Sequence, residues 1–164
     1  MRKIVVLGGA GDMGQVIVRD LVETAAADQL IIADFNLDKA NKIKSQLASP
    51  KLSTSHADIK NAASLVSVLR DASVVVNSTP YYFNVNVMEA ALEAGCHYLD
   101  LGGLFHVTRK QLELNAKFAQ KKLLAVLGMG AAPGITNVMA SAGAKELDTV
   151  TDIDIAIGCV DFVK

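Results

Sequence analysis

Short apolar runs alternate with amphipathic stretches along nearly the whole chain. Apolar positions three or four residues apart predict helices, whereas short runs rich in aliphatic side chains predict buried strands. Such runs predict strands over Lys3–Leu7, Leu30–Ala33, Ser73–Asn77, Tyr98–Leu101 and Leu123–Leu127, and Leu52–His56 is expected as a further, third strand in chain order. The stretches between them predict helices over Asp12–Ala27, Leu37–Leu47 and Ala62–Leu69, from Asn84 or Asn86 to Ala94, up to about Lys121, and from Pro133 to about Leu147.

This alternation of strand and helix predicts right-handed crossovers and an α/β fold. Its doubly wound parallel sheet would carry helices on both faces. The stretch Val150–Ile157 differs, because its apolar and polar residues alternate and predict a half-exposed strand. We therefore expect a first domain over residues 1–147, and expect residues 148–164 to begin a second, truncated one.

Composition narrows the classes of partner. The 164 residues carry a net charge of −1, which argues against a nucleic-acid partner, since such domains tend to be strongly basic. The uncharged stretch Leu123–Ala144 is long enough to span a membrane, but glycines and a proline interrupt it, so we expect no membrane contact. Only two cysteines occur, far apart, and no histidine has zinc-ligand spacing with either. We expect a cytoplasmic protein with free thiols and no metal site.

A glycine motif at the first strand–helix junction indicates a dinucleotide site. The motif G-x-G-x-x-G is formed by Gly9-Ala10-Gly11-Asp12-Met13-Gly14, and Asp34 follows it at the end of the second predicted strand. We expect Gly9 to permit the tight turn, Gly11 to admit the pyrophosphate and Gly14 to allow close helix packing. The helix amides would face the phosphates, and Asp34 would accept hydrogen bonds from the ribose hydroxyls. The predicted fold is therefore of the Rossmann type.

The carboxylate at position 34 favours NAD over NADP, because it repels a 2′-phosphate. No arginine follows Asp34 until Arg70, although Lys39 is near enough in sequence to offer an alternative cation.

Further candidate contacts with the cofactor follow the third and fourth predicted strands. Asp58 is expected either to bind the adenine amino group or to cap the next helix. Ser78, Thr79 and Pro80 are expected along the nicotinamide ribose, with ordinary loop chemistry as the alternative.

Three later segments resemble the saccharopine dehydrogenase-like family. They are Asn77-Ser78-Thr79-Pro80, the run from Cys96 to Gly103 (CHYLDLGG), and the run from Gly128 to Asn137 (GMGAAPGITN). The short Ala-Ala-Pro-Gly form and Asp34 look most like the lysine 6-dehydrogenase branch. The resemblance covers nearly the whole chain. It implies NAD(P)-linked oxidation of an amino-acid C–N bond, or the reverse reduction.

The chemistry that the resemblance implies suggests further site residues. Asp100 would orient a substrate ammonium and Tyr98 would carry a proton, unless Tyr98 is simply a core aromatic. His106 is either a titrating group or a surface residue, and Cys96 is a core residue or a further group on the strand face of Tyr98. Substrate binding is expected at Pro133, Gly134 and Asn137, where a helix begins and its amides would hold a carboxylate.

The resemblance also implies a second domain. The enzymes that the chain resembles have two domains and more than twice the length of this chain. Their second domain completes the substrate pocket and forms the contacts of a homodimer. We therefore expect a small amino-acid substrate and a dimer in the longer protein. The isolated chain would bind the cofactor without turnover. The competing hypothesis is a non-catalytic module that senses NAD(H) or works with a separate subunit.

Overall fold

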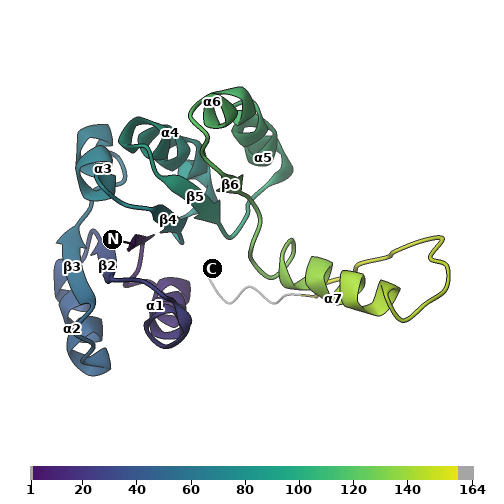
Figure 1. Ribbon diagram of the computed structural model, residues 1–164, viewed down its shortest axis with the longest axis horizontal. Coiled ribbons are helices and arrows are strands. Elements are labelled where there is room, and N and C mark those ends of the chain that lie inside the picture. The colour runs from purple at the N-terminus through teal and green to yellow at the C-terminus, as the bar shows by residue number, and fades with distance from the viewer. Residues whose placement is uncertain (1, 159–164) are drawn as a thin grey trace.

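The computed structural model describes residues 2–158, and its centre is a six-stranded parallel sheet (Figure 1). The strand order is β3-β2-β1-β4-β5-β6. The strands are β1 (Lys3–Leu7), β2 (Gln29–Asp34), β3 (Leu52–His56), β4 (Val74–Asn77), β5 (His97–Asp100) and β6 (Ala125–Val126). The chain winds outward from β1 to β3 and then crosses to β4, which confirms the Rossmann-type α/β fold and places a topological switch point between β1 and β4.

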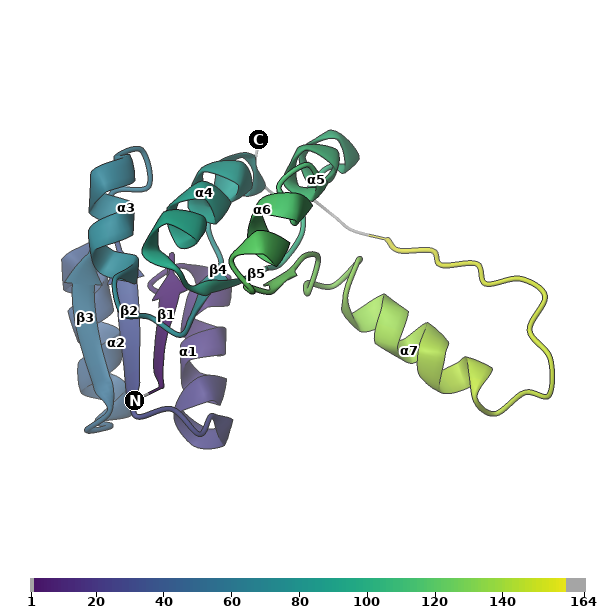
Figure 2. The same cartoon turned by 45° about the horizontal axis from the view of Figure 1, so that its top comes forward.

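Helices cover both faces of the sheet (Figure 2). On one face lie α1 (Asp12–Thr24) and α2 (Leu37–Leu47), which pack on Val6, Leu30 and Ile32. The other face carries α3 (Ala62–Leu69), α4 (Asn84–Ala94), α5 (Phe105–Leu112) and α6 (Asn115–Gln120). Its core includes Val5, Val75 and Tyr98. Alternate residues of each strand point to opposite faces of the sheet, so the apolar strands contribute side chains to the cores on both faces.

Several element boundaries differ from those expected. α1 ends at Thr24 rather than Ala27, because the backbone of Ala25 is extended. The helix expected up to Lys121 is divided into α5 and α6, with the buried Leu114 between them. β6 is limited to the two residues that pair with Tyr98 and Leu99 of β5. A short 3₁₀ turn, η1 (Tyr81–Phe83), precedes α4.

The last helix, α7 (Ile135–Ala144), projects away from the sheet, and the chain after it turns back and runs alongside α7 (Figures 1 and 2). None of the residues of α7 is buried. The strand expected over Val150–Ile157 is not formed, since this stretch has no ladder partner among residues 2–158 and a lone strand leaves its backbone groups unpaired. Within the same residues, no helix combines the length and the hydropathy that a bilayer crossing requires.

Candidate functional site

A groove of about 280 Å³ opens at the carboxyl ends of β1, β2 and β4, next to the switch point. Five of the residues expected to bind the cofactor line it together: Gly11, Asp34, Ser78, Thr79 and Pro80. Leu7, Gly8, Phe35, Ala57 and Ile59 complete the wall. Ligands of open α/β sheets bind in this crevice, so the fold brings residues from three separate loops to the place where a dinucleotide would lie.

The left-handed backbone conformation of the glycine loop is at Gly8, with φ +72°, and Gly9 follows it in the same turn. A Cβ atom at Gly9 would instead lie 2.9 Å from the carbonyl oxygen of Val6, so this position is small for reasons of space. At Gly14 a Cβ would come within 2.7 Å of the Cα of Gly9. Gly14 therefore lets the first turn of α1 pack directly on the loop, as predicted.

The N-terminus of α1 is open to the groove side. Its N-cap is Gly11, and no side chain caps the helix. The next two residues, Asp12 and Met13, are exposed, and the side chain of Met13 keeps 58% of its accessible surface. Uncapped amides at a helix N-terminus favour an anion, so the geometry fits the pyrophosphate of a dinucleotide.

Asp34 is held against the glycine loop. The backbone amide of Ala10 donates to its Oδ2 atom at 2.9 Å, and that of Asn36 donates to Oδ1 at the same distance. Each carboxylate oxygen has a second lone pair, so both remain able to accept a ribose hydroxyl. The carboxylate is partly exposed in the groove wall, which fits the role predicted for it.

Ser78 and Thr79 join the turn after β4 to its surroundings. The hydroxyl of Ser78 donates to the carbonyl of Leu7 at 2.8 Å, and that of Thr79 donates to Oδ1 of Asn77 at 2.6 Å. Both hydroxyl hydrogens are therefore used within the protein, and the oxygens remain as acceptors.

Asp58 does not cap α3, because Asn61 is the N-cap of that helix. The carboxylate of Asp58 instead accepts a hydrogen bond from the amide of Lys60 at 2.9 Å.

A second, more polar hollow of about 300 Å³ lies on the other side of the glycine loop. It is lined by Ala10, Asp12 and Gln15 from the loop and α1, and by Lys39, Lys42, Ile43 and Gln46 from α2. The two lysines bring positive charge next to the loop that follows β1. The sequence indicated Lys39 alone, because Lys42 joins it only through the helical spacing of α2.

Tyr98 and Asp100 lie on one strand face, as expected, but both are only 1% exposed. The hydroxyl of Tyr98 donates to Oδ2 of Asp100 at 2.9 Å and accepts from Nδ2 of Asn77 at 3.2 Å. Burial, with the nearby charge of Asp100 as a second cause, raises the pKa of Tyr98 far above its ordinary value. This geometry favours the alternative, a core aromatic, and does not support direct proton transfer to a substrate.

The N-terminus of α7 differs from that of α1. The amide of Gly134 donates to Oδ1 of Asn137 at 3.1 Å, while the amides of Ile135 and Thr136 donate to backbone carbonyls. Pro133 and Gly134 precede the helix, which corrects the expectation that it begins at Pro133. Because these amides already have acceptors, the geometry does not support their predicted binding of a substrate carboxylate.

Other side chains also have clear positions. Burial raises the pKa of the Cys96 thiol to about 11, so this cysteine is an inert core residue. His106 is exposed in the first turn of α5, as the surface alternative predicted.

Phe35 is a groove residue that was not predicted. It lines the groove with 70% of its surface exposed, and its ring centroid lies 5.4 Å from that of His56. Its place directly after Asp34 was the available signal.

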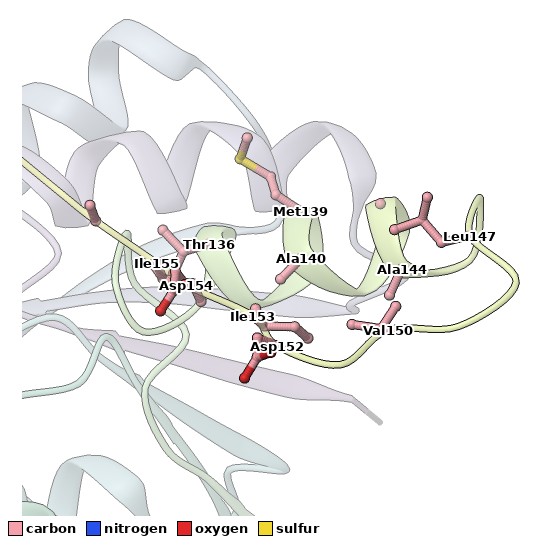
Figure 3. Close-up of a pocket in the computed structure, with 12 residues that line it drawn as sticks. Thr136, Met139, Ala140, Ala144, Leu147, Val150, Asp152, Ile153, Asp154 and Ile155 are labelled. Carbon is pink, nitrogen blue, oxygen red and sulfur yellow. The ribbon is translucent and has the colours of Figure 1, made fainter.

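A larger hollow, of about 390 Å³, lies between α7 and residues 150–156 (Figure 3). Its wall is mainly apolar and includes Met139, Ala140, Leu147 and Ile153. None of the residues predicted to bind the cofactor contributes to it.

Comparison with known proteins finds a family match over the part of the chain that forms the groove. The saccharopine dehydrogenase NADP binding domain family matches residues 4–126. Carboxyaminopropylagmatine dehydrogenase of Synechocystis sp. is 28% identical over 94% of this chain, and carboxynorspermidine synthase of Vibrio cholerae is 29% identical over 92%. The chain spans 41% and 42% of these two relatives.

Among solved structures, saccharopine dehydrogenase (L-Glu forming) from Saccharomyces cerevisiae superposes with a TM-score of 0.75 at 21% identity. The match covers 89% of this chain and 31% of the yeast protein, and it supports the fold. The family match includes the glycine loop, Asp34 and the turn after β4. The chain therefore belongs to the saccharopine dehydrogenase family and contains its NAD(P)-binding domain.

Proposed function

We propose that this chain is the cofactor-binding part of an NAD(P)-dependent oxidoreductase that acts on a C–N bond of an amino acid or a carboxylated amine. One observation carries the proposal: the groove at the switch point gathers Gly11, Asp34 and Thr79 beside the uncapped N-terminus of α1. The names of the two bacterial relatives describe a carboxylated agmatine derivative and a carboxylated norspermidine. They support a substrate that carries both an amine and a carboxylate.

In this proposal the residues of the chain bind and orient, while the dinucleotide supplies the hydride chemistry. The amides of α1 hold the pyrophosphate, Asp34 holds the adenosine ribose, and the loop Ser78–Pro80 lies against the nicotinamide half. Hydride loss from an amine requires its neutral form, so a proton acceptor must lie near the substrate. Tyr98 and Asp100 are buried among partners of their own, which supports a chain that binds the cofactor without turnover when isolated.

For the form of the cofactor, Asp34 supports NAD, because its carboxylate would repel a 2′-phosphate. The hollow with Lys39 and Lys42 favours the second candidate, NADP, because two cations lie next to the glycine loop. Titration calorimetry with NAD and NADP at moderate salt separates them. Tighter binding of NADP would contradict the preference for NAD.

Residues 148–164 support a second proposal, that a further domain begins here and contributes to a homodimer in a longer chain. Exposed apolar side chains on α7 and on residues 150–157 offer a surface for such contacts. The coverage of the two relatives, below half of their length, is consistent with such a domain.

The experiment that tests the catalytic proposal follows the absorbance of the reduced cofactor after addition of NAD or NADP. The substrates would be lysine, saccharopine and carboxynorspermidine, tested with the chain alone and with a longer chain that contains the second domain. Turnover only in the longer chain is the expected result. Cofactor binding without turnover by either chain would favour the competing hypothesis, a non-catalytic NAD(H)-binding module.

A further inference from the structure

A cluster of buried polar side chains lies at the carboxyl ends of β4 and β5. Each of its five members is 1% exposed: Asn77, Asn84, Tyr98, Asp100 and Gln111. Burying polar groups costs free energy unless they are hydrogen-bonded, so such a cluster has a defined hydrogen-bond pattern. Its centre is the carboxylate of Asp100.

Asp100 joins two loops through one oxygen. Its Oδ1 atom accepts from the backbone amides of Gly102 and Gly128, both at 2.8 Å. Its Oδ2 atom accepts from the hydroxyl of Tyr98 at 2.9 Å and from Nε2 of Gln111 at 2.6 Å. Gly102 follows β5 and Gly128 follows β6, so a single carboxylate fixes the loops that leave two neighbouring strands.

The two loops are packed closely and contain little side-chain material. A Cβ atom at Gly102 would lie 3.3 Å from the Cα of Gly128, and one at Gly128 would lie 2.7 Å from Cγ of Pro133. Both glycines have positive φ, +98° and +74°. Neither position has a side chain of its own, so hydrogen bonds set the spacing of the two loops. They are the bonds to the Asp100 carboxylate and one from the amide of Met129 to the backbone carbonyl of Asp100, at 2.8 Å.

The cluster also reaches the cofactor groove. Nδ2 of Asn77 donates to the Tyr98 hydroxyl at 3.2 Å, and Oδ1 of Asn77 accepts from the hydroxyl of Thr79 at 2.6 Å. Thr79 lines the groove. The loop after β5 also packs closely against Tyr81, since a Cβ atom at Gly103 would lie only 2.6 Å from the Cβ of Tyr81. Tyr81 directly follows the groove residue Pro80, so this contact is a second link between the loop and the groove.

We propose that Asp100 is a positioning residue that holds the Gly102 and Gly128 loops in register with the nicotinamide half of the cofactor groove. Tyr98 and Asn77 connect it to Thr79. The inference rests on the proposed function, because it assigns these loops to the part of the groove beyond the adenosine end. In doubly wound sheets the two halves of the sheet each take one half of a dinucleotide, and β4–β6 form the second half here.

The test compares NADH with ADP, which contains only the adenosine half of the ligand. In the unaltered chain, NADH should slow hydrogen–deuterium exchange in residues 101–104 and 127–134 at least threefold, whereas ADP should leave both segments unchanged. In Asp100→Asn, which keeps the volume but loses the charge, both segments should exchange faster than in the unaltered chain. Affinity for NADH should fall at least fivefold and affinity for ADP should stay within twofold.

The matched control is Gln111→Met, which removes one donor from the other oxygen of the same carboxylate and leaves the two glycine amides their acceptor. It should keep the ratio of NADH to ADP affinity of the unaltered chain. The inference is overturned if Asp100→Asn changes neither exchange nor the ratio, if Gln111→Met reproduces its effects, or if NADH leaves both loops unprotected in the unaltered chain. Absence of any NADH binding to the unaltered chain would instead refute the proposed function, while the exchange of Asp100→Asn still tests the loop anchor.

Discussion

The carboxylate of Asp34 accepts a hydrogen bond from the backbone amide of Ala10 at 2.9 Å, and so ties the end of β2 to the glycine loop. The residue that would recognise the ribose thus also fixes the loop that would recognise the pyrophosphate. In the proposed binding mode, recognition of the ribose and of the pyrophosphate would therefore be coupled through one side chain.

Asp34→Asn should lower the affinity for NAD about tenfold, because a hydrogen bond to a charged acceptor is roughly twice as strong as one to a neutral acceptor. Affinity for NADP should fall less, since the repulsion of a 2′-phosphate is removed as well. Titration calorimetry measures both. Asp20→Asn, an exposed change in α1, serves as the control and should leave both affinities unaltered. A proportional loss for the two cofactors would contradict the charge argument.

Gly11→Val should reduce dinucleotide affinity at least about 100-fold, or about 3 kcal/mol, because the side chain would occupy the approach of the pyrophosphate. The fold should persist, since the nearest atom to a Cβ at this position is the carbonyl oxygen of Gly8, at 3.3 Å. Equilibrium binding and thermal unfolding are measured together. Gly143→Ala, at a position whose Cβ meets no atom within 4 Å, should bind normally. Normal binding by Gly11→Val would refute the site.

Two glycines separate the cost of backbone conformation from the cost of packing. Gly95 and Gly128 have nearly equal φ, +75° and +74°, but only at Gly128 would a Cβ meet another group, Cγ of Pro133 at 2.7 Å. Gly95→Ala should cost about 1 kcal/mol of unfolding free energy, and Gly128→Ala about 2 kcal/mol more. Urea denaturation measures both. Equal costs would show that the loops move apart freely.

Cys96 should make the protein less stable in alkali. Its pKa is about 11 in the folded chain, against an ordinary value of 9.0, because the thiol is buried. The contribution of the buried thiol to the unfolding free energy is fully present below pH 9. It is lost as the pH rises towards 11, because the thiol ionises at a lower pH in the unfolded chain than in the folded chain. At pH 10 the loss is about 1.4 kcal/mol. Urea denaturation at pH 8 and pH 10 should show this extra loss in the unaltered chain and not in Cys96→Ala. An identical pH dependence in the two proteins would contradict it.

The exposed face of α7 should promote self-association. Met139 keeps 67% of its surface exposed and lies beside the hollow of Figure 3. Met139→Lys should lower the weight-average mass at high concentration in sedimentation equilibrium, because it adds a charge to an apolar surface. Leu112→Lys, at a similarly exposed position on α5, should not. Equal effects of the two changes would point to general solubility instead.

The sheet could be predicted from the sequence because its signal is local. The apolar run Lys3–Leu7 coincides with β1 and the run Ser73–Asn77 includes β4, and the parallel arrangement follows from the alternation with helices. The failure at Val150–Ile157 has the opposite cause. A half-exposed strand needs a neighbouring strand, and alternation alone states only that one face is apolar.

The groove at the switch point could be predicted because adjacent strand ends converge there, so the topology alone brings Gly11, Asp34 and Thr79 together in its wall. The anchor at Asp100 could not, because it depends on amides of Gly102 and Gly128, which come together through tertiary packing. The same limit applies to α7. A proline and a glycine at a helix start suggest free amides, but the acceptors at Gly130, Ala131 and Asn137 become visible only in the folded chain.

The bare first turn of α1 also has a consequence for the choice of buffer. A cap made of glycine leaves donors that any multivalent anion can reach, so sulfate and inorganic phosphate should compete with the dinucleotide. Affinities measured in phosphate buffer would then appear weaker than those in a buffer of monovalent salts. Pyrophosphate alone should raise the melting temperature of the chain, and should do so less in Gly11→Val.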